Sequence, residues 1–108
     1  MAQTTAQSTL DLLILKTLDR GPNHGFGITN HIQKASEGLL RIDEGSLYPA
    51  LHRLERDGLI SGKWAISENA RRARFYDLTK AGRERLKEHE GDWRSLSAGV
   101  TRVLEFAL

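Results

Sequence analysis

The sequence predicts a mainly α-helical domain that carries one small β-hairpin. Three observations lead to this fold class. Apolar residues recur at helical spacing over the first half of the chain, two short β-prone runs follow, and a heptad pattern fills the C-terminal part. The chain has 108 residues, of which 39% are hydrophobic and 28% are charged. This length and composition are typical of one compact soluble domain.

The first predicted helix begins at Ser8 or Thr9, whose hydroxyl groups can cap it, and it ends at Gly21-Pro22. The polar residues 1–8 are expected to form a flexible N-terminus. Apolar side chains occupy nearly every position from Leu10 to Leu18, so this helix must be covered on more than one side. A second subunit could supply part of that cover.

Two further helices are expected before the β-prone runs. One starts at Asn23 or His24 and reaches about Ser36, and the other starts at Asp43, Glu44 or Ser46 and stops at Gly58. In the latter helix, a buried stripe is formed by Leu47, Leu51 and Leu54. Its opposite face is predicted to carry Ser46, Pro49, His52, Arg53 and Arg56.

Strands are predicted at 59–66 and 75–78, with a polar hairpin tip at 67–72. Thr79 is predicted to cap a last helix, in which apolar residues alternate four and three positions apart. Gly91 and Gly99 lie within this pattern and leave open whether the helix is continuous. A long apolar seam at the end of a small domain indicates that this helix packs on a partner.

The formal net charge is only +2, but its distribution is uneven. The segments 1–40 and 76–108 are each neutral, so the whole surplus lies in residues 41–75. Between positions 62 and 74, the only acidic residue is Glu68, against Lys63, Arg71, Arg72 and Arg74. A small basic footprint of this kind suits contact with phosphate groups.

Three helices followed by a charged hairpin form the arrangement of a winged helix-turn-helix. A helix fits the major groove of DNA, where arginine reads guanine, and a basic hairpin (the wing) lies along the backbone or enters the minor groove. The third helix alone could be an ordinary amphipathic surface helix. Its combination with a basic hairpin favours double-stranded DNA as the partner.

Several motifs resemble PadR-type transcriptional regulators. They are Leu12-Leu13-Ile14-Leu15, His24-Gly25-Phe26-Gly27-Ile28, the run GSLYPALHRLERDGLI from Gly45 to Ile60, and Arg72-Ala73-Arg74-Phe75-Tyr76. The resemblance runs from about Leu10 to the end of the chain and is most specific in the middle motif. Phe26 stands where many members have tyrosine. The chain is most similar to the short subgroup, in its acidobacterial-type branch.

The resemblance implies a homodimer in which the first and last helices pack across the subunit interface. Two reading helices would then enter successive major grooves of a pseudo-palindromic operator, roughly 34–36 Å apart. Members of the family usually repress nearby genes and often respond to small molecules. Residues 9–78 would form the DNA-binding part, and 79–108 a dimerisation helix of the same compact domain.

Eight residues are candidates for contact with DNA: Ser46, Tyr48, Pro49, His52, Arg53, Arg71, Arg72 and Arg74. Ser46 either contacts a base or phosphate or caps its helix. Arg53 is the first choice for a base or phosphate contact, and Arg71 and Arg72 are expected to bind phosphates at the tip of the wing. For Arg74, pairing with an acidic residue of the hairpin is the favoured alternative.

The dimer interface is predicted to contain Leu10, Leu13, Ile14, Leu86, Trp93, Leu96, Val100, Val103 and Leu104. Trp93 either fills this interface or forms a flat wall for a small aromatic effector. His89 lies in the same seam and either titrates near neutral pH or is inert. Trp64 is expected to pack within the wing.

Other classes of protein fit the sequence poorly. It has no cysteine, no apolar run of membrane-spanning length and no signal peptide at its start, so a cytoplasmic protein is expected. The four histidines share no metal-ligand spacing, Gly25-Phe26-Gly27 is an incomplete dinucleotide motif, and neither a cofactor nor enzymatic activity is expected. The rival interpretation is a winged helix that binds proteins rather than DNA.

Overall fold

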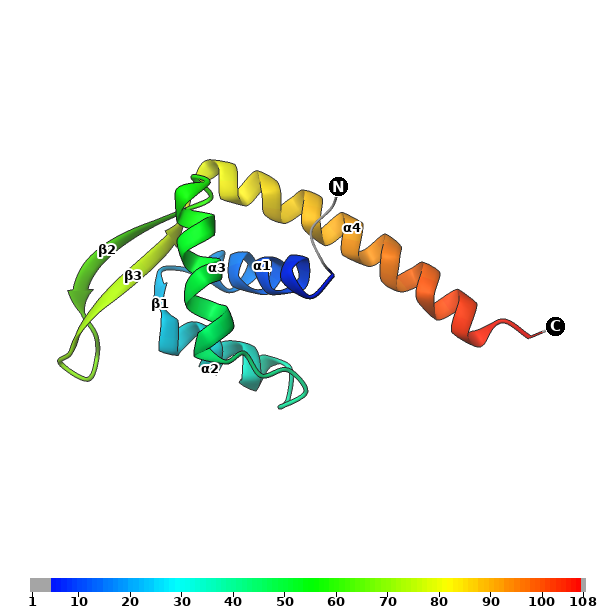
Figure 1. Ribbon diagram of the computed structural model, residues 1–108, viewed down its shortest axis with the longest axis horizontal. Helices are drawn as coiled ribbons and strands as arrows, with labels where there is room; N and C mark the ends of the chain where they lie inside the picture. Colours follow the sequence, from blue (N-terminus) through cyan, green and yellow to red (C-terminus); the bar gives the residue numbers. More distant parts are fainter. Residues whose placement is uncertain (1–4, 108) are drawn as a thin grey trace.

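The computed structural model describes residues 5–107, with side chains from Thr9 onward. It confirms the predicted fold class: a helical body, a small antiparallel sheet and a long C-terminal helix (Figure 1). The elements in chain order are α1 (Thr5–Leu18), β1 (Asn23–His24), α2 (Gly25–Ala35), α3 (Glu44–Arg56), β2 (Ile60–Ile66), β3 (Arg72–Leu78) and α4 (Lys80–Glu105). Residues 1–4 of the expected flexible N-terminus lie outside the described residues. Residues 5–8 are helical, because Ala6 and Gln7 have enough helix propensity to extend α1.

The core lies where α1, α2, α3 and the base of the sheet meet. The most deeply buried residues include Ile14, Leu15, Leu18, Ile28, Leu47, Leu51, Leu54 and Ile60. Because α2, α3 and the first half of α4 of the same chain all contact α1, they supply most of the cover that the apolar first helix needs. The prediction that Ile14 and Leu86 lie in a dimer interface is therefore wrong, since their exposed fractions are 0% and 3% within one chain.

The sheet has three antiparallel strands in the order β1-β3-β2. In the hairpin, β2 and β3 pair from Ile60↔Leu78 to Ile66↔Arg72. β3 starts at Arg72, three residues before the predicted start at Phe75. β1 was not predicted at all, because a two-residue strand has no periodicity to detect. Its pairing with β3 attaches the hairpin to the helical body at the start of α2.

Thr79 caps α4, as predicted. Its Oγ1 accepts a hydrogen bond from the Gly82 N–H at 3.0 Å and donates to the carbonyl oxygens of Gly58 at 2.7 Å and Leu59 at 3.0 Å. Gly82 allows this close approach, since a Cβ there would overlap the Leu59 carbonyl oxygen. One side chain thus connects the end of α3, the start of β2 and the start of α4.

α4 is continuous from Lys80 to Glu105 and passes through both Gly91 and Gly99. Its first half packs on α1, whereas its second half extends beyond the rest of the molecule (Figure 1). With this projecting helix included, the longest dimension of the molecule is 59 Å. Within the described part of the chain, no helix combines the length and the apolar character that a bilayer crossing requires.

Candidate nucleic-acid interface

α3 presents the N-terminal half of one face to solvent. Asp43 is its N-cap, and its Oδ1 accepts a hydrogen bond from the Ser46 N–H at 2.8 Å. Ser46 therefore does not cap the helix, and its side chain lies exposed in the first turn. Pro49 and His52 are exposed on the same helix, as expected, while Leu47, Leu51 and Leu54 form its buried stripe.

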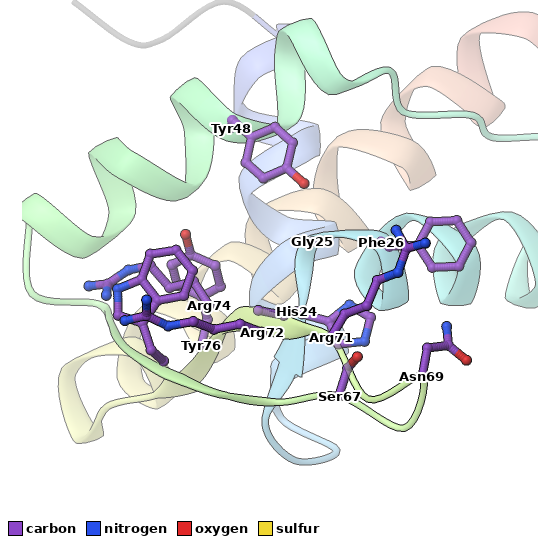
Figure 2. Close-up of a pocket in the computed structure, with 12 residues that line it drawn as sticks. His24, Gly25, Phe26, Tyr48, Ser67, Asn69, Arg71, Arg72, Arg74 and Tyr76 are labelled. Atoms are coloured by element: carbon purple, nitrogen blue, oxygen red, sulfur yellow. The ribbon is translucent and has the colours of Figure 1, made fainter.

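Tyr48 lies at the edge of α3 that faces the start of α2. Its side chain is 47% exposed. The ring passes so close to Gly25 that a Cβ there would lie 2.7 Å from the Tyr48 hydroxyl oxygen. Glycine at position 25 lowers helix propensity, but its missing side chain makes room for Tyr48. The Tyr48 hydroxyl group points into a groove beside α3 (Figure 2).

Arg53 does not lie on the outward face of α3, so the prediction that it is the leading contact with a base or phosphate is wrong. Its guanidinium group forms a bidentate ion pair with Asp11 of α1, with N–O distances of 2.9 and 3.1 Å. The two side chains are only 20% and 4% exposed. A carboxylate buried in an apolar helix needs a cation, and Arg53 borders the buried stripe of α3 closely enough to reach it. The signal in the sequence was the single acidic residue within the apolar run of α1.

Arg74 also binds a carboxylate, but its partner lies on α3 rather than in the hairpin. Its Nη2 is 2.6 Å from Oε2 of Glu55, and this hydrogen bond, opposed by partial desolvation, raises the pKa of the arginine above its usual value. Arg71 and Arg72 are exposed on the wing, in accordance with their predicted role. The Arg72 guanidinium carbon lies 4.7 Å from the centre of the Trp64 ring. Trp64 therefore contacts Arg72 within the wing, while 56% of its surface stays exposed.

A groove of about 880 Å³ separates the wing from α3 and the start of α2 (Figure 2). Aromatic rings and cations alternate along its walls, and they include Phe26, Tyr48, Trp64, Arg71, Arg72 and Tyr76. Arg71 extends from the wing along the mouth of the groove. Such a mixture of guanidinium, hydroxyl and aromatic groups suits a polyanionic strand.

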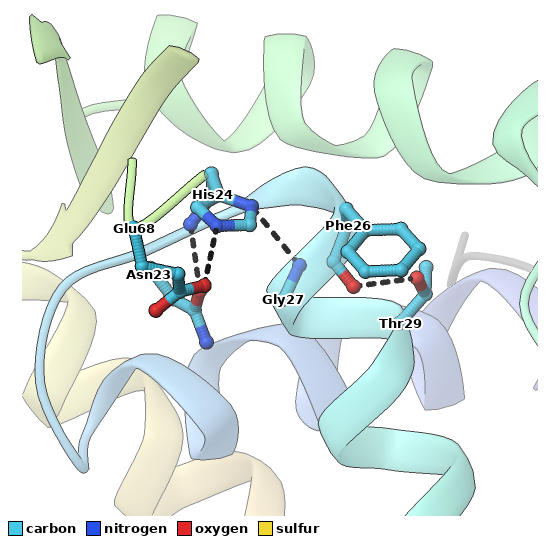
Figure 3. Close-up of polar contacts among 6 residues, drawn as sticks. All are labelled: Asn23, His24, Phe26, Gly27, Thr29 and Glu68. Carbon is cyan, nitrogen blue, oxygen red and sulfur yellow. Dashed lines mark hydrogen bonds and ion pairs between the residues drawn. The ribbon is translucent and has the colours of Figure 1, made fainter. Parts of the chain in front are cut away.

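His24 connects the wing tip to α2, a role that the sequence analysis missed. Its Nδ1 accepts a hydrogen bond from the Gly27 N–H at 3.1 Å and so caps α2 (Figure 3). Because Nδ1 is the acceptor, the proton of the neutral ring is on Nε2, which lies 3.8 Å from Oε1 of Glu68 in the hairpin turn. The only signal in the sequence was the position of His24 directly before a glycine-rich helix start.

Apart from the buried Leu86, the predicted interface residues of α4 form one exposed apolar stripe. Trp93, which is 44% exposed, begins it, and Leu96, Val100, Val103 and Leu104 continue it along the projecting half of the helix. A shallow depression of about 480 Å³ runs along the same stripe. On α1, Leu10 and Leu13 are partly buried at the edge of the core. Among the described residues, no group of three or more potential metal ligands comes together.

Comparison with known proteins gives consistent matches. The model of the "Transcriptional regulator PadR-like family" matches residues 14–88. The transcriptional regulator Rv3488 of Mycobacterium tuberculosis is 40% identical over 81 residues, which cover 75% of this chain and 69% of that protein.

Solved structures of regulators share the fold. A PadR family transcriptional regulator from Eggerthella lenta superposes with a TM-score of 0.77 at 30% identity, covering 94% of this chain and 86% of the other. For a transcriptional regulator from Clostridium thermocellum, the TM-score is 0.81 at 26% identity, with 93% and 97% covered.

Proposed function

Because this chain belongs to the PadR-like family of transcriptional regulators, we propose that it acts as a homodimeric repressor that binds a pseudo-palindromic operator. The observation that carries the proposal is the groove with Tyr48 of α3 on one side and the basic wing on the other, beside the exposed N-terminal part of α3. Residues 9–78 would bind DNA, and residues 79–108 would hold the dimer together. A regulator of this kind works in the cytoplasm.

The contacts divide by position. Ser46, Pro49 and His52 lie on the exposed face of α3 and would meet base edges in the major groove. Tyr48, Arg71 and Arg72 line the groove and would bind backbone phosphates, which position the protein without reading sequence. Arg53 and Arg74 have carboxylate partners within the protein, so they are not assigned as contacts.

The apolar stripe on the projecting half of α4 supports the homodimer. An exposed row of large apolar side chains on a long helix is unfavourable in water and is buried when two such helices pair. In the dimer, Trp93 would lie near the Trp93 side chain of the other subunit. A small planar aromatic effector could then bind against these rings and release the operator. Titration of aromatic cations while following Trp93 emission tests this, with Trp64→Phe removing the other tryptophan signal.

The test of DNA binding is a salt series. A duplex selected from a random pool should bind with a steep fall of log affinity against log salt concentration. Replacing both Arg71 and Arg72 with alanine should lower that slope by about 3.6, because the dimer loses four phosphate contacts and each removes about 0.9. Arg94→Ala, which removes an exposed cation on α4, is the matched control and should leave the slope nearly unchanged.

The alternative function is a winged helix that binds another protein. It predicts that no duplex is selected from the random pool. Any weak residual binding to DNA should then have a flat salt slope in every variant. A flat slope in wild-type protein would therefore exclude the DNA-binding proposal.

A further inference from the structure

We propose that Glu55, Arg74 and Trp64 form a ladder that fixes the wing against α3 and presents Arg72 to the DNA backbone. On this proposal Arg74 is a positioning residue and not a phosphate contact. The inference rests on the proposed DNA-binding function and adds how its reading helix and wing are kept in register.

Arg74 is held on several sides by the protein itself. Its Nη2 binds Glu55 of α3 at 2.6 Å, and the two side chains are 32% and 31% exposed. The guanidinium carbon lies 5.9 Å from the ring centres of both Trp64 and Tyr76. Gly62 of β2 leaves space for it, because a Cβ there would lie 2.8 Å from the Arg74 Nε. These contacts fix the guanidinium group between α3 and the hairpin.

Trp64 lies between Arg74 and Arg72 and contacts both of their guanidinium groups. It lies directly opposite Arg74 in the β2–β3 pairing. Arg72 is two residues before Arg74 on β3 and so shares its face of the sheet, with its guanidinium carbon 4.7 Å from the Trp64 ring centre. The indole ring therefore contacts both guanidinium groups, and that of Arg72, the residue nearer the tip of the wing, is exposed to solvent.

The ladder matters because a short hairpin alone does not hold a charged side chain in one position. Two short strands are marginally stable alone, and a mobile wing would have to lose conformational freedom when it binds DNA. A wing that is already held at a set distance from α3 avoids that loss. The Glu55 carboxylate then strengthens DNA binding, although its negative charge faces a polyanion.

Glu55→Gln separates this mechanism from simple electrostatics. Removing a negative charge near the DNA-binding face should tighten binding if only the overall field matters. The ladder predicts the reverse, a roughly threefold to tenfold loss of affinity, with a lower salt slope because Arg72 is no longer held in place. Glu44→Gln, on the first turn of the same helix, is the matched control and should bind as tightly as wild type or more tightly.

Salt slopes of arginine variants test the role of Arg74. If it only positions Arg72, the double variant Arg72→Ala with Arg74→Ala should have the same slope as Arg72→Ala alone, about 1.8 below wild type, because the dimer loses two contacts. A further decrease of about 1.8 in the double variant would make Arg74 a phosphate contact in both subunits and overturn the proposal.

A charge exchange and a fluorescence signal complete the test. Combining Glu55→Arg with Arg74→Glu should recover most of the affinity lost in either single variant. In a Trp93→Phe background, Glu55→Gln should shift the Trp64 emission, because the ring loses its fixed neighbour. If Glu55→Gln binds operator at least as tightly as wild type, with circular dichroism showing it folded, the ladder is refuted while DNA binding stands. Failure of wild-type protein to bind any duplex would instead refute the proposed function.

Discussion

The ion pair between Asp11 and Arg53 should contribute strongly to folding stability. Asp11→Ala removes a carboxylate that is only 4% exposed and that accepts two charge-assisted hydrogen bonds, at 2.9 and 3.1 Å. Breaking a fully buried pair on one side costs about 3–5 kcal/mol. Because Arg53 keeps a fifth of its exposure and can be partly rehydrated, we expect a loss of about 2–3 kcal/mol in the free energy of unfolding.

Urea unfolding followed by circular dichroism measures this loss. With a typical denaturant dependence of about 1–3 kcal/mol per molar urea, the midpoint should fall by roughly 0.7–3 M. Protein concentration must be held constant, because dimerisation would itself shift the midpoint. Arg56→Ala is the matched control on α3, because the Arg56 side chain is 66% exposed and forms an exposed ion pair with the adjacent Asp57. This variant should change the free energy of unfolding by less than about 0.5 kcal/mol. A loss below about 0.5 kcal/mol in Asp11→Ala would refute the structural role assigned to Arg53.

Three further outcomes are expected. Gly82→Ala should lower the free energy of unfolding by about 2 kcal/mol or more, and with it the melting temperature, because the new Cβ would overlap the Leu59 carbonyl oxygen. Gly91→Ala, which has open space around it, should stabilise α4, so equal melting temperatures of the two variants would contradict this. Burial raises the pKa of Tyr76, with Arg74 opposing, so the folded protein holds this proton more tightly and the free energy of unfolding should fall as pH rises above about 10. Urea unfolding of Tyr76→Phe across that range should show a smaller fall, and an unchanged pH dependence would refute the assignment. Val100→Asp should convert a dimer to monomers in sedimentation velocity, while Thr101→Asp should not; a dimer that survives Val100→Asp would argue against the α4 interface.

Local patterns predicted the local structure well. Thr79 and the heptad spacing identified the last helix, and the stripe of Leu47, Leu51 and Leu54 identified the reading helix, because capping and periodicity act over a few residues. The exposed positions of Ser46 and Arg72 followed from the same patterns. Two-residue β1 carries no such pattern and was taken for the start of a helix.

Long-range pairing could not be predicted from one sequence. Arg53 and Asp11 are 42 residues apart, and Arg74 and Glu55 are 19 apart, so nothing local distinguishes these arginines from Arg71 or Arg72. Ile14 shows a related limit. An apolar helix surface must be covered, but the pattern does not say whether the same chain or a partner covers it.

The Thr79 hydroxyl group lies between the part of the molecule proposed to bind DNA and the helix proposed to form the dimer. It connects Gly58, just after the end of α3, to the first turn of α4 by two hydrogen bonds. In the proposed dimer, a small change in the crossing angle of the two α4 helices would change the separation of the two α3 helices. DNA accepts that separation only near one helical turn. A ligand bound between the α4 helices would therefore release an operator without contacting any residue that touches DNA.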